Sequence, residues 1–288
     1  MHDQHVSCKD VIAKPPRNGP GANPETTVGV TFPAPAGNSP RVDRLTVLVP
    51  VYNGEDVLDD TLRVFAEMLQ APPIPCELLF VDDGSTDGTW RKLREFQAGR
   101  ANVHIIRLAR NFGEFAALRA GFANARFDVI VSTEMNLEHD WHELFRLAAL
   151  LSDDLDLVNA RRVRRSGPTY RIVASWAINA FVHFVGGLPL RDANSILRVW
   201  RRESGLNISS QPFYDHYIRR LFAARTVEIP VDCSRRSPQR SRYRLRFLAR
   251  AFFTMAKAAV DLRWRGPDSV ADVTTTRYEI AEEFGAKE

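Results

Sequence analysis

The sequence predicts an α/β protein in which a mostly parallel β-sheet carries helices on both faces. From Arg44 onward, short apolar runs rich in β-branched residues alternate with longer amphipathic stretches. Strand and helix in alternation are typical of a parallel sheet with crossover helices. Polar residues and glycines follow most of the apolar runs, as expected where ligand-binding loops leave the carboxyl ends of the strands.

Five apolar runs have the length and composition of buried strands. Each is short, contains Val, Ile, Leu or Phe, and is bounded by polar or turn-forming residues, which is the pattern of a strand covered on both faces. The runs are residues 45–49, 78–81, 103–106, 129–132 and 155–158.

Amphipathic segments fill the gaps between these strands. In the first segment, Leu58, Leu62, Phe65 and Leu69 recur at spacings of four, three and four residues, which places them on one face of a helix. Further helices are expected over residues 87–96, 114–125 and 141–151.

The chain divides into three regions by composition. Residues 1–43 are rich in Pro, Gly, Asn and Ser and have no helix or strand period, so we expect a disordered N-terminal extension. A globular domain over residues 44–243 follows, and then a basic amphipathic helix and a polar tail over residues 244–288, the tail starting after residue 265. No apolar core stands behind a basic start at the N-terminus, and the 3 cysteines are scattered. These features argue against a signal peptide and a disulfide framework and predict a cytoplasmic location.

The charge balance is nearly even but unevenly distributed. Lys and Arg number 39 against 35 Asp and Glu, a formal net charge of +4, which is too small an excess to indicate a nucleic-acid partner. Acidic residues are frequent in the first half, and many arginines lie between residues 161 and 265. This division suits a protein in which one region holds a cation and another contacts phosphate.

Two later segments bear on membrane contact. Residues 172–190 contain no Lys, Arg, Asp or Glu, but polar residues from Arg171 to His183 recur every four positions, and glycines and a proline close the segment. We therefore expect a helix with one polar stripe, not a membrane span. Residues 244–265 have the pattern of a basic amphipathic helix, which suits an anionic membrane surface or a partner helix. A helix packed on the domain, with solvated arginines, is an equal alternative.

The clearest motif is VDDGSTDGT at residues 81–89. It ends a predicted strand in Asp82 and Asp83 and continues into a Gly-Ser turn. Two carboxylates at such a position can accept hydrogen bonds from the N3 proton of uracil or from the corresponding edge of guanine; the alternative is a helix-capping turn with surface acids. The patterns GxxxxGK[ST], GxGxxG and GxSxG are absent from the sequence, so ATPases, dinucleotide oxidoreductases and α/β-hydrolases lack their usual support.

Several motifs together resemble those of the inverting family 2 glycosyltransferases, and most of all their polyprenyl-phosphate branch. That branch includes dolichol-phosphate mannose synthase and undecaprenyl-phosphate sugar transferases. The matching segments follow the same order over residues 45–243: VPVYNGEDVL, VDDGSTDGT, ARNFGEFAALRAGFANA, RIVASWAINA, DANSILRVWRR and RRSPQRSRY. The resemblance implies the GT-A fold and transfer of a hexosyl group from a UDP- or GDP-sugar to polyprenyl phosphate with inversion. It also implies work at the inner face of the membrane, by peripheral contact or through a membrane partner subunit.

The resemblance assigns donor binding to residues at three strand ends and in a later loop. In the family, the later loop closes over the diphosphate, which brings cations to the leaving group and excludes water. The implied nucleotide-sugar-binding residues are Pro50, Tyr52, Asp82, Asp83, Asn111, Gly113, Arg236, Ser241 and Arg242.

The family's metal-binding motif, Asp-x-Asp-Leu-Gln, corresponds here to residues 134–138, which read EMNLE. The second acid of the motif holds Mg²⁺ or Mn²⁺ in the family, whereas Asn136 is neutral and a poorer ligand for a hard cation. Three hypotheses follow, in order of preference. Glu138 takes over ligation, with Glu134 and Asn136 beside it; or arginines and helix ends replace the metal; or the protein is not catalytic.

Two histidines follow this motif. His139 and His142, with Glu143, do not have a known zinc-binding spacing and lack a third histidine. They are therefore expected as solvated residues at the start of a helix.

The resemblance places the acceptor phosphate on Arg161, Arg171 and Ser175. Arg171 and Ser175 are four residues apart and share one face of the predicted helix. A lipid phosphate is already an anionic nucleophile, so positioning by an arginine supplies much of the catalysis. The expected catalytic set is Glu134, Asn136, Glu138, Arg171 and Ser175. Asp192, Ser195 and Arg198 match a family segment that lines the site.

Two other functions remain open at this stage. The same fold can act on a soluble phosphorylated acceptor in specialised-metabolite or polysaccharide assembly. The altered motif at residues 134–138 also suits a non-catalytic subunit that binds a nucleotide sugar.

Overall fold

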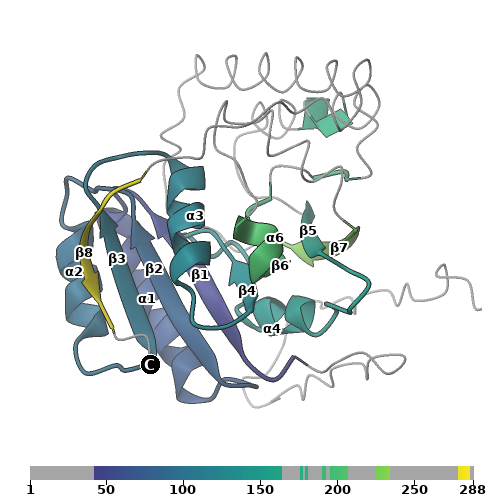
Figure 1. The fold of residues 1–288 in the computed structure, drawn as a ribbon, viewed down its shortest axis with the longest axis horizontal. Helices are drawn as coiled ribbons and strands as arrows, with labels where there is room; N and C mark the ends of the chain where they lie inside the picture. The colour runs from purple at the N-terminus through teal and green to yellow at the C-terminus, as the bar shows by residue number, and fades with distance from the viewer. Residues whose placement is uncertain are drawn as a thin grey trace, which may run out of the picture. The chain divides into compact units, whose positions relative to one another are not determined.

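The computed structural model describes residues 42–163, 176–177, 179–180, 190–192, 195–206, 225–233 and 278–285. At the centre of this part of the chain lies an eight-stranded mixed sheet (Figure 1) with the strand order β7-β5-β6-β4-β1-β2-β3-β8.

The first four strands are parallel and form the middle of the sheet. They are β1 (Leu45–Val51), β2 (Cys76–Asp82), β3 (Val103–Leu108) and β4 (Val129–Ser132). β1 pairs with β2 on one side and with β4 on the other, and β3 pairs with β2. Every residue of β2 is buried, as its run of apolar residues predicts for a strand covered on both faces. The four strands predicted first are confirmed.

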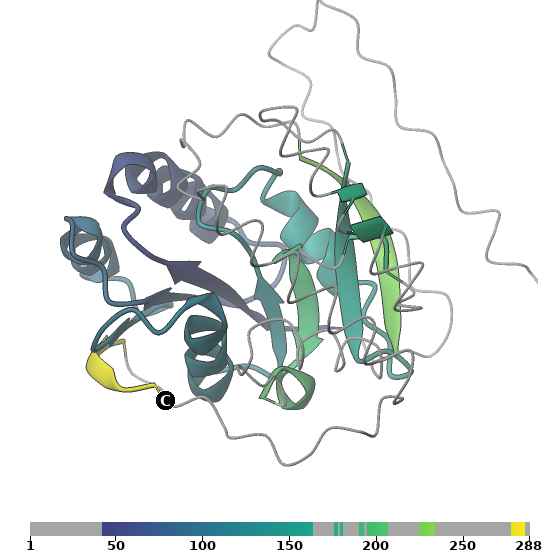
Figure 2. The same ribbon diagram turned by 90° about the horizontal axis from the view of Figure 1, so that it is seen from above.

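Helices cover both faces of the sheet, as Figure 2 shows from above. One apolar core joins the sheet to α1 (Glu55–Gln70), α2 (Thr89–Gln97) and α4 (His142–Ala148). A second core on the opposite face joins it to α3 (Glu114–Asn124) and α6 (Arg202–Leu206). The α/β fold class is therefore confirmed. Helix α4 is shorter than the predicted range of residues 141–151.

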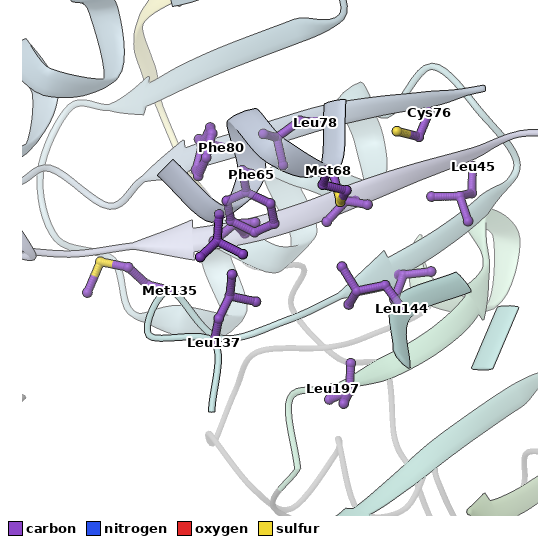
Figure 3. Packing of buried hydrophobic residues seen from close by; sticks show 14 of the residues in the cluster. Leu45, Phe65, Met68, Cys76, Leu78, Phe80, Met135, Leu137, Leu144 and Leu197 are labelled. Atoms are coloured by element: carbon purple, nitrogen blue, oxygen red, sulfur yellow. The ribbon is translucent and has the colours of Figure 1, made fainter. Parts of the chain in front are cut away.

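The first core also anchors the segment that follows β4. Figure 3 shows Met135 and Leu137 among the packed side chains, together with Phe65 and Phe80. The rings of Phe65 and Phe80 meet edge to face at 5.7 Å, a favoured aromatic geometry. Burying Met135 and Leu137 fixes the turn that carries Asn136 between them and Glu134 and Glu138 on either side.

The other four strands extend the sheet at both edges. They are β5 (Leu157–Val163), β6 (Arg198–Arg201), β7 (Thr226–Asp232) and β8 (Ile280–Phe284). β6 is antiparallel to β4 and β5, β7 is parallel to β5, and β8 is antiparallel to β3. Of these four strands, only β5 was predicted from the sequence. The predicted range, residues 155–158, begins two residues before the observed strand and ends before it does.

β8 corrects the predicted domain boundary. Residues 266–288 were expected to form a polar tail, but residues 280–284 complete the sheet beside β3. The predicted N-terminal extension up to residue 41, most of the helix over 172–190 and the amphipathic helix over 244–265 lie outside the described residues. In the described part of the chain, none of the helices is both long enough and apolar enough to cross a bilayer.

Candidate functional site

One edge of the sheet gathers the ends of six strands. β1 to β4 are parallel, and β5 and β7 run in the same direction because both are related to β4 through the antiparallel strand β6. Their carboxyl ends therefore lie along the same edge, where α/β proteins bind ligands. The polar segments at residues 52–54, 83–88, 109–113 and 133–138 all follow these ends.

The loops after β1 and β2 are joined by hydrogen bonds. The Asn53 amide donates to Ser85 Oγ at 2.8 Å, and the Thr86 amide donates to Asn53 Oδ1 at 2.8 Å. Asn53 has a positive φ of 47°, which asparagine tolerates better than most residues. Tyr52 remains 43 % exposed beside this junction. Its free ring is available for contact with a planar ligand at the sheet edge, next to Pro50 at the end of β1.

Asp83 joins the loop after β2 to the loop after β3. Its two carboxylate oxygens accept the backbone N–H groups of Phe112, at 2.7 Å, and of Gly113, at 2.8 Å. Gly113 has a φ of 96°, which favours glycine. Burial raises the pKa of Asp83 to about 6 despite these hydrogen bonds. The carboxylate therefore organises the loop that carries Asn111, which is exposed.

Asp82 is fully enclosed at the end of β2. Its Oδ1 accepts the Ser85 amide at 3.1 Å. Its Oδ2 has no hydrogen-bond partner among the residues that the structure describes and lies 3.4 Å from Nε of Arg107. Burial raises the pKa of Asp82, because a carboxylate loses hydration there. In this arrangement of the loops, Asp82 holds the turn and is not exposed to a nucleotide base.

The turn after β4 presents its polar residues away from the core. Met135 and Leu137 are buried, and the alternate residues Glu134, Asn136 and Glu138 are partly exposed. The Asn136 amide nitrogen donates to Glu138 Oε1 at 3.1 Å, so these two side chains lie together. The Thr61 hydroxyl of α1 fixes the turn by donating to the Met135 carbonyl at 2.7 Å.

These residues make an incomplete cation site on their own. Among the described residues, no three His, Cys, Asp or Glu side chains converge in a way that could hold a metal ion. Glu138 and the Asn136 amide oxygen are nevertheless adjacent oxygen donors. Mg²⁺ often binds one or two carboxylates and completes its shell with substrate phosphates and water, so the donor set fits a cation that arrives with a diphosphate.

A partly buried charged cluster lies next to this turn. The Arg162 guanidinium donates from Nε and Nη2 to the two oxygens of Asp192, at 3.0 and 3.1 Å, and lies 3.7 Å from Glu134. Burial alone would lower the pKa of Arg162, but the charge and hydrogen bond of Asp192, together with the charges of Glu134 and Glu138, outweigh it, and the pKa lies above its usual value. Burial, and then the charge of Glu134, raise the pKa of Glu114 to about 7.

Arg198 and Asn159 extend the cluster along β5 and β6. Arg198 Nε donates to Asn159 Oδ1 at 2.6 Å, and Asn159 Nδ2 donates to the Asp192 carbonyl at 3.1 Å. Burial lowers the pKa of Arg198 to about 9. Two guanidinium groups are thus held beside several carboxylates at the sheet edge, an arrangement that can position anionic groups by charge and hydrogen bonding.

Arg161 and Arg162 are neighbours on β5, and of the two only Arg162 joins the charged cluster. The acceptor-phosphate role expected of Arg161 stays a prediction. Arg161 forms no ion pair within the described residues, whereas Arg162 contacts Asp192 and Glu134. Successive residues of a strand point to opposite sides, so the signal that separates them is the register of β5, which starts later than predicted. Glu114 was missed as well, although it follows Gly113 at the start of α3.

The remaining predicted residues are five that were assigned from the resemblance and two histidines. Arg171, Ser175, Arg236, Ser241 and Arg242 lie outside the described residues. His142 is partly exposed, but the prediction of a solvated His139 is wrong: it is 1 % exposed, with Nε2 at 2.9 Å from Thr133 Oγ1 and Nδ1 at 2.9 Å from the Asp140 carbonyl. The sequence signal for a solvated residue failed because β4 and its turn enclose the ring.

Comparison with known proteins gives one family. Residues 46–215 match the model for "Glycosyl transferase family 2". An undecaprenyl-phosphate 4-deoxy-4-formamido-L-arabinose transferase of Klebsiella pneumoniae is 30 % identical over 251 residues, which cover 86 % of this chain and 72 % of that protein. The enzyme of the same name from Sodalis glossinidius is 28 % identical over 219 residues, 75 % of this chain and 67 % of that protein.

Solved structures share the fold at low sequence identity. Glucosyl-3-phosphoglycerate synthase of Mycobacterium tuberculosis, in complex with Mn²⁺, UDP and glucosyl-3-phosphoglycerate, aligns with a TM-score of 0.56 and 17 % identity over 79 % of this chain and 82 % of that one. Mannosyl-3-phosphoglycerate synthase of Rubrobacter xylanophilus aligns with a TM-score of 0.58 and 18 % identity over 80 % and 77 % of the two chains.

Proposed function

The chain belongs to glycosyl transferase family 2, and from this premise we propose that it transfers a hexosyl group from a UDP- or GDP-sugar to a polyprenyl phosphate, with inversion. The choice of a polyprenyl phosphate as acceptor rests on the 30 % identity, over 86 % of the chain, to a transferase named for undecaprenyl phosphate. The strand-end loops support the donor side, because they place Tyr52 and Asn111 on the surface of the edge where such sheets bind ligands.

In the proposed reaction, an oxygen of the acceptor phosphate attacks C1 of the donor sugar. The bond between C1 and the diphosphate oxygen breaks on the opposite face, which inverts the anomeric centre and releases the nucleoside diphosphate. The acceptor is already anionic, so no proton has to be removed from it. What the protein must supply is position and positive charge. Arg162 and Arg198 lie beside the turn after β4, but neighbouring carboxylates offset their charge, so a bound cation would supply the rest.

The proposal includes a divalent cation as part of the donor complex. Glu138 and Asn136 would hold it with the diphosphate, and the ion would supply positive charge for the leaving group. Asn136 brings no charge of its own. Asn136→Asp is therefore expected to tighten Mn²⁺ binding in the presence of UDP or GDP, measured by calorimetry. Wild-type activity that disappears with EDTA and returns at low micromolar metal would show that Asn136 does not weaken metal binding.

The proposal also covers location. We expect the protein to act in the cytoplasm at the inner face of the membrane, where the phosphate of a polyprenyl lipid meets soluble nucleotide sugars, by peripheral contact or through a membrane partner subunit. Basic residues within 244–265 support electrostatic contact with anionic lipids.

The experiment is transfer of labelled sugar from a panel of UDP- and GDP-sugars to undecaprenyl phosphate in detergent, with and without Mn²⁺. Arg171→Ala should lower transfer by roughly 10²-fold, while affinity for the nucleotide stays within about a factor of two; Arg63→Ala, on the exposed side of α1, is the control. Transfer only to soluble phosphorylated acceptors would replace the lipid acceptor. Nucleotide binding without any turnover would identify a binding subunit.

A further inference from the structure

The C-terminal strand β8 forms the outer edge of the sheet, against a strand far from it in the sequence. β8 pairs antiparallel with β3, with Arg107 opposite Glu282 and Ile105 opposite Phe284, and Figure 1 shows it in yellow beside β3. The Ala109 amide donates to the Glu279 carbonyl at 2.8 Å. The pairing thus reaches the point where β3 leaves the sheet for the loop that carries Asn111.

Aromatic and cationic contacts fix the end of β8 on α2. The ring of Phe284 lies 6.1 Å from that of Trp90, and the Arg94 guanidinium lies 4.6 Å from the centre of the Phe284 ring. Both residues belong to α2, the helix that begins at the last residue of the VDDGSTDGT turn. β8 is therefore attached to the same element that the turn leads into.

Arg107 connects β8 to the loop after β2. From β3, its guanidinium donates to Glu282 Oε1 at 3.2 Å and to the Ser85 carbonyl at 3.0 Å, and its Nε lies 3.4 Å from Asp82 Oδ2. The guanidinium also lies 5.6 Å from the centre of the Trp90 ring, within the range of a cation–π contact. Only Glu282, among these partners, belongs to the C-terminal segment.

Arg107 contacts residues whose hydrogen bonds shape the loops after β1 and β2. Ser85 accepts the Asn53 amide through its hydroxyl and donates its own amide to Asp82. Asn53 in turn accepts the Thr86 amide. If Arg107 moved, Ser85 and the residues bonded to it would move as well. The positions of both loops would therefore change, including the loop that carries Tyr52.

The neighbouring residue of β8 provides an internal comparison. Glu283 Oε1 lies 2.8 Å from Nε2 of His104, whose Nδ1 lies 3.4 Å from Glu77. Glu77 accepts the Thr46 hydroxyl and the Arg126 amide, near the amino ends of β1 and β2 and away from the loops. Glu282 and Glu283 thus each contact a side chain of β3, Arg107 and His104, and these contacts lead to opposite ends of the sheet.

We propose that β8 is a structural part of the nucleotide-binding loops and that Glu282 is a positioning residue acting on them through Arg107. The inference rests on the proposed function only for the ligand. Glu282 is 37 % exposed and Arg107 31 % exposed, and ion pairs at such positions contribute modestly, roughly 1 kcal/mol or less. That corresponds to a change in affinity of up to about 5-fold.

The test compares Glu282→Ala with Glu283→Ala in the full chain, with Glu282→Gln as the conservative variant. Hydrogen exchange of peptides covering residues 52–56 and 84–88 should rise in Glu282→Ala and stay at the wild-type level in Glu283→Ala. Calorimetry with UDP and GDP should show a Kd about 3- to 5-fold higher in Glu282→Ala. Glu282→Gln, which keeps an acceptor oxygen for Arg107, should recover part of the loss.

Two outcomes would overturn the inference. Unchanged exchange of both loops in Glu282→Ala refutes the positioning role, whatever the ligand. Equal effects of Glu282→Ala and Glu283→Ala refute it too, because they would show only that β8 stabilises the sheet. If wild type binds neither UDP nor GDP while exchange still separates the variants, the proposed donor is wrong, and the nucleotide part of this inference is overturned with it, but the link from β8 to the loops stands.

Discussion

Replacing Glu114 by glutamine tests whether the charged cluster stores unfavourable electrostatic energy. Glu114 is the first residue of α3, and its carboxyl group senses the charges of Glu134 and Asp83 as well as those of Arg162 and Arg198. Burial, with the Glu134 charge added, raises its pKa from 4.5 to about 7. Glutamine has nearly the same shape and cannot ionise, so Glu114→Gln removes the titration with little change in packing.

The sign of the effect follows from the direction of the pKa shift. In the unfolded chain the carboxyl group loses its proton near pH 4.5, whereas in the folded protein it keeps the proton until about pH 7. The folded state therefore binds more protons between these values, and its stability falls as pH rises through this window. The loss is complete above pH 7 and amounts to at most about 3 kcal/mol.

Thermal unfolding at pH 5 and at pH 8, in EDTA, measures the effect. Glu114→Gln should be more stable than wild type at pH 8, by several degrees in Tm at about 2–4 °C for each kcal/mol, and the advantage should shrink at pH 5. Glu67→Gln, an exposed change on α1, is the control and should show no pH-dependent difference. An equal Tm difference at both pH values, or a destabilised variant at pH 8, would refute the argument that Glu114 is forced to ionise against its surroundings.

Two further predictions concern the loops. Gly84→Ala should destabilise the fold by about 2 kcal/mol or more, because φ is +68° and a Cβ would lie 2.3 Å from the Arg110 carbonyl carbon. Gly99→Ala, at φ +75° with open space around it, is the matched control in chemical denaturation. Asp83→Asn should cost about 1–3 kcal/mol, since an amide can accept only one of the two N–H groups of Phe112 and Gly113; exposed Asp60→Asn is its control, and equal midpoints would contradict it.

The middle of the sheet could be predicted because its strands carry strong local signals. β1 to β4 are rich in apolar residues, and α1 has a clear apolar face, so burial and period coincide with the observed elements. β8 carries no such signal. Its residues IAEEF alternate between partly buried and exposed positions at the sheet edge, and its acids are explained only by their partners Arg107 and His104 on β3.

The place of the candidate site could be predicted from the sequence, whereas the contacts of its residues could not. The rule that ligands bind at the carboxyl ends of parallel strands depends only on strand order. The role of Asp83 depends on a loop nearly thirty residues away, whose amides occupy both carboxylate oxygens. Whether Arg161 or Arg162 faces the charged cluster depends on strand register, because a shift of one residue reverses which side chain points there.

The charges of the cluster lead to an expectation for the proposed donor. Among the described residues, Asp83, Glu114, Glu134 and Asp192 accompany only Arg162 and Arg198, so a fully ionised cluster would repel a diphosphate. The raised pKa values of Asp83, about 6, and Glu114, about 7, keep part of this charge neutral near pH 7. Affinity for UDP or GDP should therefore weaken between pH 6.5 and pH 8.5 in wild type and weaken less in Glu114→Gln, as measured by calorimetry. Parallel pH profiles for the two proteins would mean that the diphosphate does not sense the Glu114 charge and that its site lies further along the edge.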